Sequence, residues 1–202
     1  MFSDTILLAS SSPRRQQLLA ALGVPFVAVS ADIDESACDH MPVYERVQEL
    51  AKRKSLAGAD AWRSAHGVAD CPRWALGADT LVALDGTVFG KPADREHART
   101  MLETLSGRTH EVLTGLAVLD TASGVTRMIA SRTDVSVAAM GQDELTSYLD
   151  TGEWMGAAGA YRAQERAGLF IERVSGSFSG VVGLPLREFY VILGRSGYPL
   201  RR

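Results

Sequence analysis

The most constraining feature of the sequence is the octapeptide at residues 8–15, which reads LASSSPRR. The apolar run at residues 5–9 predicts a buried strand, and Pro13 is typical of the first residue of a helix. Arg14 and Arg15 then fall in the first helical turn, where the helix dipole disfavours cations. Two arginines beside hydroxyls and unpaired backbone N–H groups favour a bound anion, with phosphate the obvious candidate. The alternative is an ordinary Ser-Pro helix start with two solvated arginines.

The composition fits a folded protein and excludes several classes of function. Hydrophobic residues make up 46% of the 202 residues, enough for a sizeable core, and we expect a single domain over residues 1–202. The net charge of -3 argues against a general nucleic-acid-binding surface. No apolar run approaches the roughly 20 residues that cross a bilayer, and we see no basic leader. Cys38 and Cys71 form no zinc motif and are expected to be reduced thiols, so we predict a cytoplasmic protein without nucleic-acid or membrane partners.

Strand and helix patterns intermix along the whole chain. This mixture predicts a mixed α/β (α+β) fold with a long central sheet. The segment at residues 58–73 is rich in Ala, Gly and polar residues and is expected to be a variable loop. The patterns predict further strands at residues 26–29, 75–84, 87–89, 110–120, 128–138, 169–171 and 181–182, and helices at residues 13–22, 42–56, 94–105, 142–150 and 185–193.

Asp79 is the second feature that points to chemistry, because it lies within the otherwise apolar strand pattern at residues 75–84. A carboxylate in such a run costs free energy unless it is paired, hydrogen-bonded or bound to a metal ion. Gly77 would allow a ligand or another backbone to approach closely. Asp79 is therefore a candidate general base or metal ligand. The alternative is an aspartate at a strand end that caps a turn.

Several other charged residues are candidates of the same kind. Lys91 lies between a glycine and a proline and can point at a phosphate, and Lys54 lies near the end of a predicted helix. Asp34 and Glu35 could supply a second carboxylate for a cation, although lysines and acidic loops of this kind are often simply solvated. Cations that hold phosphates, a divalent ion and a carboxylate that orients water together fit hydrolysis of a phosphoanhydride.

Six short blocks occur along the chain in a characteristic order. They read LASSSPRR at residues 8–15, GADT at 77–80, GKP at 90–92, LSGRTHEVLTG at 105–115, AGAYRAQ at 158–164 and VVGLPL at 181–186. Together they resemble the Maf family of nucleoside triphosphate pyrophosphatases, over nearly the full chain. Each block alone is a weak signal, but the six in this order are highly specific.

The resemblance implies an activity, a cofactor and a set of site residues. The family hydrolyses a nucleoside triphosphate between the α and β phosphates and uses a divalent cation, Mg²⁺ or Mn²⁺. It implies an elongated α/β fold with two lobes around a nucleotide-binding cleft, similar to inosine triphosphatase, and often a homodimer. Asp79 matches the family's proton acceptor, and Glu35 and Asp79 are the candidate metal ligands. The residues that match its substrate-binding positions are Ser10, Arg14, Arg15, Glu35, Lys54, Thr80, Lys91 and Gln164.

Three positions resemble the branch of the family that acts on dTTP and UTP: Arg14, Thr80 and Gln164. A glutamine amide can donate to one edge atom of a pyrimidine and accept from its N3–H, whereas a carboxylate cannot donate. A related branch that acts on 7-methyl-GTP tends to carry an aromatic residue after the catalytic aspartate and an acidic residue near Gln164. Residues 156–157 and 165–166 depart from the family's usual pattern, which leaves the exact base preference open.

The sequence therefore leaves more than one function to test. The main hypothesis is a pyrophosphatase for dTTP and UTP, including modified pyrimidine nucleotides. A 7-methyl-GTP pyrophosphatase of the same family and a non-catalytic nucleotide-binding regulator of septum formation are the alternatives. A sugar-phosphate or general phosphatase would differ from all of these by releasing orthophosphate first.

Overall fold

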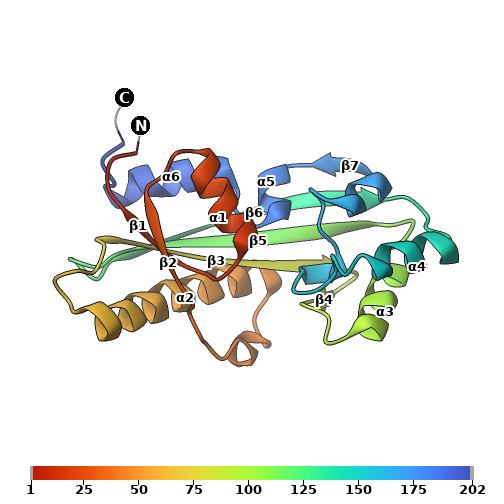
Figure 1. Ribbon diagram of the computed structural model, residues 1–202, viewed down its shortest axis with the longest axis horizontal. Coiled ribbons are helices and arrows are strands. Elements are labelled where there is room, and N and C mark those ends of the chain that lie inside the picture. The colour runs from red at the N-terminus through yellow and green to blue at the C-terminus, as the bar shows by residue number, and fades with distance from the viewer. Residues whose placement is uncertain (1, 201–202) are drawn as a thin grey trace.

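A computed structural model describes residues 2–200 of the chain. The mixed α/β prediction is confirmed, because strands and helices alternate throughout (Figure 1). The strands are β1 (Ile6–Ala9), β2 (Phe26–Val29), β3 (Trp74–Leu84), β4 (Thr87–Phe89), β5 (Thr109–Asp120), β6 (Thr126–Val137) and β7 (Ile171–Ser175). The α-helices are α1 (Pro13–Ala21), α2 (Val43–His66), α3 (Arg95–Leu105), α4 (Gln142–Asp150), α5 (Phe178–Val182) and α6 (Leu186–Ser196), and short 3-10 helices are η1 (Ser36–Cys38), η2 (Ala158–Ala160) and η3 (Arg166–Phe170).

All the described strands belong to one sheet of seven strands, in the order β2-β1-β3-β5-β6-β7, with β4 paired to β3. β1 runs parallel to β2 and β3, and the remaining pairs are antiparallel. β3, β5 and β6 are long and run the length of the molecule (Figure 1). β1 pairs with β3 only from Ile6 to Leu8, so β3 continues well beyond the end of β1.

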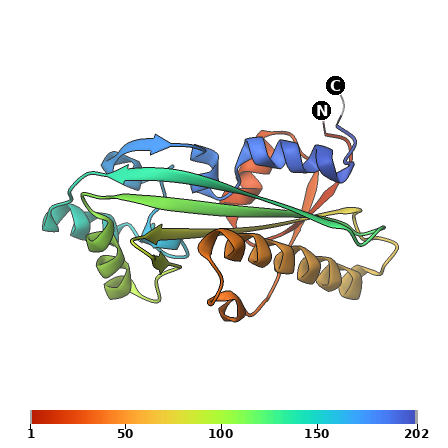
Figure 2. The same cartoon turned by 180° about the vertical axis from the view of Figure 1, so that it is seen from behind.

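Helices cover both faces of the sheet, and two glycines allow α2 to lie very close to it. α2 packs on β3 and β5, and α6 packs on the opposite face against β5 and β6 (Figure 2). A Cβ atom at Gly77 would lie 2.0 Å from the Ala51 carbonyl oxygen, and one at Gly115 would lie 2.2 Å from that of Val47. Side chains at these two strand positions would push α2 away from the sheet. This close approach brings the side chains of α2 within reach of β3.

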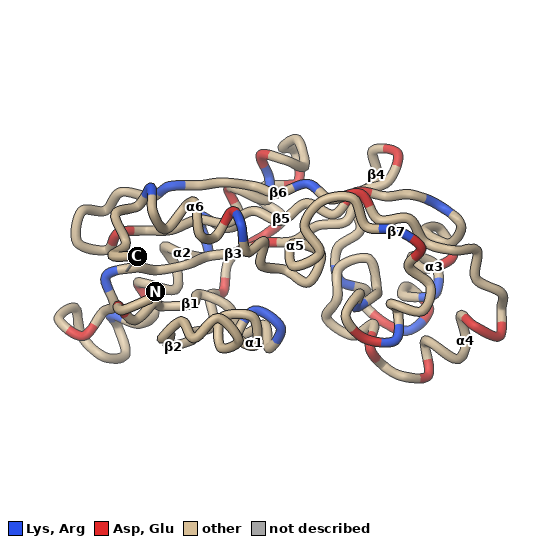
Figure 3. Tube along the Cα trace, turned by 90° about the horizontal axis from the view of Figure 1, so that it is seen from above, with Lys and Arg blue, Asp and Glu red and all other residues tan. Residues whose placement is uncertain are grey.

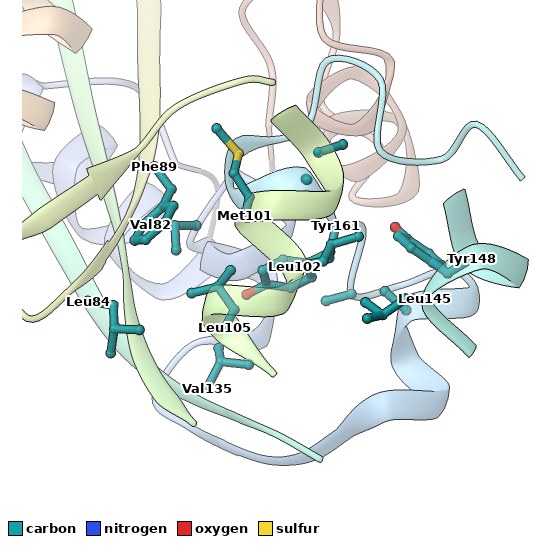
Figure 4. Packing of buried hydrophobic residues seen from close by; sticks show 14 of the residues in the cluster. Val82, Leu84, Phe89, Met101, Leu102, Leu105, Val135, Leu145, Tyr148 and Tyr161 are labelled. Carbon is teal, nitrogen blue, oxygen red and sulfur yellow. The ribbon is translucent and has the colours of Figure 1, made fainter. Parts of the chain in front are cut away.

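The core divides into two main clusters at opposite ends of the long strands. One cluster, under α1 and α6, contains Trp74, Phe189 and Leu8. The other lies between the sheet, α3 and α4 and contains Leu105 and Tyr148 (Figure 4). Because β3 and β5 pass through both clusters, they connect the two ends covalently as well as by hydrogen bonds.

Two sequence predictions about local structure are wrong, and a third, the strand at residues 169–171, is largely wrong because residues 169–170 lie in η3 and only Ile171 belongs to β7. The first is the loop over residues 58–73, because α2 continues to His66 before Gly67 ends it. A Cβ atom at Gly58 would lie 2.4 Å from Cβ of Ala9, so this glycine is required for helix packing and does not break the helix. The second is the strand at residues 181–182, which belong to α5, where Ser177 accepts a hydrogen bond from the Gly180 N–H at the helix start.

The other predicted elements are found close to their expected positions. α1 begins at Pro13, and Asp94 caps α3 by accepting from the His97 N–H at 2.8 Å. No helix within residues 2–200 has the length and apolar character needed to cross a membrane.

Candidate active site

A cavity of about 360 Å³ lies in the middle of the molecule, where β1 and β2 end and β3 continues. Its inner wall comes from β1, β3 and α2, and its outer rim comes from the segment between Met155 and Gln164. The basic residues at the start of α1 lie near the middle of the elongated molecule (Figure 3). The cavity is within the usual size range of pockets for small ligands.

Asp79 and Lys54 form the centre of the inner wall. Asp79 lies on β3 with only 4% of its surface exposed. Lys54 reaches it from α2, and its Nζ lies 2.5 Å from Asp79 Oδ1 and 2.7 Å from Glu35 Oε1. One ammonium group therefore bridges two carboxylates from different elements. Its positive charge offsets the repulsion between the two negative charges.

The second oxygen of Asp79 has no such partner. Asp79 Oδ2 is buried and accepts no hydrogen bond from residues 2–200. A buried carboxylate oxygen without a partner costs free energy, so a ligand, water or cation at this position would stabilise the site. Burial opposes ionisation of Glu35, but the hydrogen bond from Lys54 and the charges of Lys54 and Lys91 outweigh it and lower the pKa of Glu35. Glu35 is therefore a carboxylate at neutral pH.

Arg15 is fixed by three hydrogen bonds. It donates from Nε to the Gly183 carbonyl oxygen at 2.8 Å, from Nη1 to Ser10 Oγ at 3.1 Å and from Nη2 to Thr80 Oγ1 at 3.2 Å. Burial lowers the pKa of Arg15, and the negative charge of Asp79 partly offsets that effect. The guanidinium stays charged, because an arginine pKa starts far above neutral pH. It is held as a rigid cation beside the cavity.

Thr80 belongs to the same network through its hydroxyl group. Thr114 Oγ1 lies 3.0 Å from Thr80 Oγ1 and donates to the Gly180 carbonyl oxygen at 2.8 Å. Since the Thr114 proton is used there, Thr80 donates to Thr114 and accepts from Arg15. The Thr80 hydroxyl proton is therefore already used in a hydrogen bond. Although Thr80 lines the cavity, its main role there is to hold Arg15 in place.

Arg14 lies on the rim side of the cavity. Its Nη2 donates to the Gly156 carbonyl oxygen at 3.3 Å, which links α1 to the rim. Burial lowers the pKa of Arg14, and the nearby positive charge of Arg162 lowers it further. Two neighbouring cations facing one cavity repel each other. An anion between them would relieve that repulsion.

The structure brings every predicted site residue except Asp34 to this one cavity; the Asp34 carboxylate instead accepts hydrogen bonds from the Ser36 N–H and hydroxyl. Lys91 lines it from the loop after β4, and Gln164 lines it from the rim; both side chains are exposed. The full set of predicted residues along the cavity is Ser10, Arg14, Arg15, Glu35, Lys54, Asp79, Thr80, Lys91 and Gln164. These residues are spread from position 10 to position 164 of the sequence, so only the fold brings them together.

Comparison with known proteins assigns the chain to a family. The profile of the Maf family, described as Maf-like protein, matches residues 5–196. The chain belongs to the Maf family. The Maf chain is 43% identical over 196 residues to the dTTP/UTP pyrophosphatase of Symbiobacterium thermophilum. The aligned region covers 96% of this chain and 95% of the relative.

Other relatives match over a similar length. The dTTP/UTP pyrophosphatase of Chromobacterium violaceum is 40% identical and covers 98% of both chains, and that of Nitrosospira multiformis is 44% identical and covers 96% of this chain and 95% of the relative. Among solved structures, the nucleoside-triphosphatase of Mycobacterium abscessus is 16% identical, with a TM-score of 0.37 over 67% of this chain and 75% of that one. That structural likeness is too low to support an inference about this Maf protein.

The sequence did not point to the apolar residues of the cavity. Val82, Val112 and Tyr161 line the cavity in addition to the charged residues. The Tyr161 hydroxyl lies 2.8 Å from Nε2 of His110, and both side chains are buried. Burial lowers the pKa of His110 to about 4 and raises the pKa of Tyr161, so both groups are neutral near pH 7. Tyr161 lies in the AGAY block, so this motif contained the available signal.

A second missed residue is Arg162, which also lines the cavity. It donates from Nη2 to the Met155 carbonyl oxygen at 2.9 Å and pairs with Glu165. It lies between the tyrosine and the glutamine of the AGAYRAQ block, at a position to which the resemblance assigned no role. The rim therefore carries one more cation than the sequence suggested.

The carboxylates of the cavity fit a divalent cation that is shared with a ligand. Within the described chain, no three His, Cys, Asp or Glu side chains gather into a metal-binding cluster. Asp79 Oδ2 lacks a hydrogen-bond partner. The Glu35 carboxylate lies close by, because Lys54 Nζ contacts both Glu35 and Asp79. Mg²⁺ commonly binds one or two carboxylates and takes its remaining ligands from water and substrate phosphates. Two protein carboxylates are therefore sufficient for a site completed by a phosphate.

Proposed function

We propose that this Maf protein hydrolyses dTTP and UTP to the nucleoside monophosphate and pyrophosphate. The observation that carries the proposal is the position of Asp79, which is buried, anchored by Lys54 and placed in a cavity lined by further cations. The relatives at 40–44% identity that are named dTTP/UTP pyrophosphatase support the substrate class.

The cations hold the triphosphate. Arg15 is a fixed donor on the inner wall, while Arg14 and Lys91 approach from α1 and from the loop after β4. Guanidinium and ammonium groups form short, charge-assisted hydrogen bonds to phosphate oxygens. In a partly desolvated cavity these interactions are stronger than in water, and they fix the position of the reacting phosphorus.

Asp79 acts as the general base. A water oxygen attacks the α phosphorus, the bond from that phosphorus to the α–β bridging oxygen breaks, and pyrophosphate leaves with the bond electrons. The proton of the water passes to the Asp79 carboxylate. Lys54 holds Asp79 through Oδ1, which leaves Oδ2 to accept that proton.

A divalent cation completes the proposed site. Asp79 and Glu35 would hold it, and because each carboxylate oxygen has two lone pairs, Asp79 would keep one of them for the proton of the water. When bound, the cation would neutralise charge on the phosphates. Chelation by EDTA is expected to abolish turnover, and excess Mg²⁺ or Mn²⁺ should restore it. A separate readout is the thermal melting temperature. Mn²⁺ added together with the product UMP should raise it, and this rise should be smaller in the Glu35→Gln variant. Full turnover in EDTA would reject the cation while leaving the proposed reaction intact.

A nucleotide panel tests the proposal directly. Purified protein with Mg²⁺ is given dTTP, UTP, CTP, GTP and 7-methyl-GTP in turn, and pyrophosphate and orthophosphate are measured separately. We expect pyrophosphate as the first product and the highest kcat/KM for dTTP and UTP. Preference for 7-methyl-GTP would move the protein to the other branch. Tight nucleotide binding without pyrophosphate would favour a regulator, and orthophosphate as the first product would indicate a phosphatase.

A further inference from the structure

Two of the sequence blocks that mark this chain contain no residue with a role in the proposed reaction. They are residues 105–115, which lead into β5, and residues 181–186, which include the end of α5. The structure brings them together, because α5 packs on β5 and β6 (Figure 1). Both blocks reach Arg15 by hydrogen bonds, Gly183 directly and Thr114 through the Thr80 hydroxyl group. The two blocks therefore meet at the fixed cation of the inner wall.

Thr114 is the junction of this network, and only 1% of its surface is exposed. It lies opposite Thr80 in the register between β5 and β3, and the two hydroxyl oxygens are 3.0 Å apart. Its own proton goes to the Gly180 carbonyl oxygen at 2.8 Å. The same carbonyl oxygen accepts from the Gly183 N–H at 3.0 Å. Thr114 is thus bonded to both of the segments that hold Arg15 from β3 and from α5.

The hydrogen bonds from Arg15 to α5 run in one direction. The guanidinium can only donate and the Gly180 carbonyl oxygen can only accept, so each hydroxyl group between them accepts from one neighbour and donates to the next. Bonds in such a chain strengthen one another. Without the Thr114 oxygen, the Thr80 proton would lose its acceptor, and the Thr80 hydroxyl group could rotate away from Arg15.

The end of α5 has a backbone shape that suits the second contact. The φ angle of Gly183 is +120°, which residues with a side chain rarely adopt. A Cβ atom at this position would lie 3.5 Å from Arg15 Nε and 3.6 Å from Thr80 Oγ1. The glycine therefore lets the backbone turn its carbonyl oxygen toward the guanidinium without a side chain beside it.

This network leaves part of the Arg15 guanidinium for a ligand. Three of its five N–H groups are used by Ser10, Thr80 and Gly183 in the described structure, and two remain for phosphate oxygens. A cation that is fixed before the substrate arrives stabilises developing charge without reorganisation. We infer that Thr114 is a positioning residue that holds Arg15 in its catalytic orientation, through Thr80 on one side and α5 on the other. This inference rests on the proposed function, in which Arg15 binds the triphosphate.

The Thr114→Val variant tests the inference, because valine keeps the shape of threonine and removes the hydroxyl group. The matched control is Thr133→Val. Thr133 is equally buried on β6, and its hydroxyl group accepts from the Ser177 N–H at 2.9 Å and donates to the Ser177 carbonyl oxygen at 3.3 Å. The control removes two hydrogen bonds to the start of α5 without a change at Thr80. For each variant, kcat and KM for UTP are measured well below its melting temperature, so that all of the protein is folded.

We expect Thr114→Val to lower kcat for UTP by about ten- to thirtyfold and to change KM by less than about threefold. A cation that moves loses more in the transition state than in the bound substrate. Thr133→Val should keep kcat within about threefold of wild type, although it should lower the melting temperature. Thr114→Ser restores the hydroxyl group and should recover most of the lost kcat.

A second variant cuts the same chain of hydrogen bonds at a partly exposed position. Thr80→Ala should lower kcat by a similar factor, so the test does not depend on whether Thr114→Val folds. A kcat close to wild type in these two variants, a change mainly in KM, no recovery in Thr114→Ser, or an equal loss in Thr133→Val would overturn the inference while the pyrophosphatase activity stands. Absence of pyrophosphate release by wild type from every nucleotide would instead refute the proposed function, and this inference with it.

Discussion

The inner wall of the cavity and its rim are held in different ways. On the inner wall, Arg15, Lys54 and Asp79 come from three elements packed around the sheet, and every one of them makes a short polar contact. On the rim, Gln164 and Glu165 are exposed and are held by one another within a few residues of chain. A reaction needs fixed geometry, whereas base selection tolerates adaptable contacts. We therefore expect turnover to depend on the wall and base selectivity to depend on the rim.

The largest expected effect is at the centre of the wall. In Asp79→Asn the amide can still accept from Lys54, so the fold should persist, but the general base is lost. We expect kcat for UTP to fall by about a thousandfold. Steady-state release of pyrophosphate measures this, with Asp143→Asn, an exposed aspartate of α4, as the control. Near wild-type turnover would remove Asp79 from the chemistry.

The packing of α2 on β3 should be the next most sensitive feature. A Cβ atom at Gly77 would lie 2.0 Å from the Ala51 carbonyl oxygen, so Gly77→Ala must move α2 and with it Lys54. Overpacking of this kind should cost about 3 kcal/mol of unfolding free energy. Urea unfolding measures it, and Gly141→Ala, where the nearest atom would be 3.7 Å away, should change little. Equal midpoints for the two variants would contradict the close approach.

The buried His110 of β5, which bonds Tyr161, gives the stability of the protein a pH dependence. Its pKa falls from 6.5 to about 4 on burial. Between those values the unfolded chain takes up a proton that the native protein does not, so stability declines as pH falls. The loss should reach about 3 kcal/mol by pH 4 and should be nearly absent above pH 6.5. His110→Gln should lose less stability over that range in urea unfolding, and an identical slope would show that His110 titrates normally.

The smallest effect is expected at the junction of the two regions. Arg14 bonds the Gly156 carbonyl oxygen on the rim, and in Arg14→Ala that contact and one cation are lost. We expect KM for UTP to rise about tenfold while kcat changes much less. Initial rates over a range of UTP concentrations separate the two constants. A fall in kcat at constant KM would place Arg14 with the wall and blur the distinction between the regions.

The wall could be predicted from sequence because its residues stand out locally. Asp79 interrupts an apolar strand, and Arg15 occupies a helix start that disfavours cations. Each anomaly is visible within a few residues of chain and needs no knowledge of distant neighbours. The long strands and most helices were predictable for a similar reason, since each has a clear apolar pattern, whereas the short predicted strands at residues 169–171 and 181–182 were largely or wholly wrong.

The rim could not be predicted in the same way. The bonds from Gln164 and Arg162 to Glu165 depend on the local course of the chain, which includes left-handed backbone at Gly159 and Ala160. The error at Gly58 has a related cause, because a glycine needed for packing against Ala9 cannot be told from a helix breaker without the neighbouring strand. The first feature depends on the local backbone path and the second on a contact between distant segments, and neither is visible in a pattern of residue types.

The most direct test of the central claim is to follow the oxygen of the attacking water. Wild-type protein with Mg²⁺ hydrolyses UTP in water labelled with heavy oxygen, and the products are analysed by mass spectrometry. Attack at the phosphorus next to the ribose, with Asp79 as base, predicts one labelled oxygen in UMP and unlabelled pyrophosphate. Label in the pyrophosphate, or labelled orthophosphate with UDP, would contradict the account.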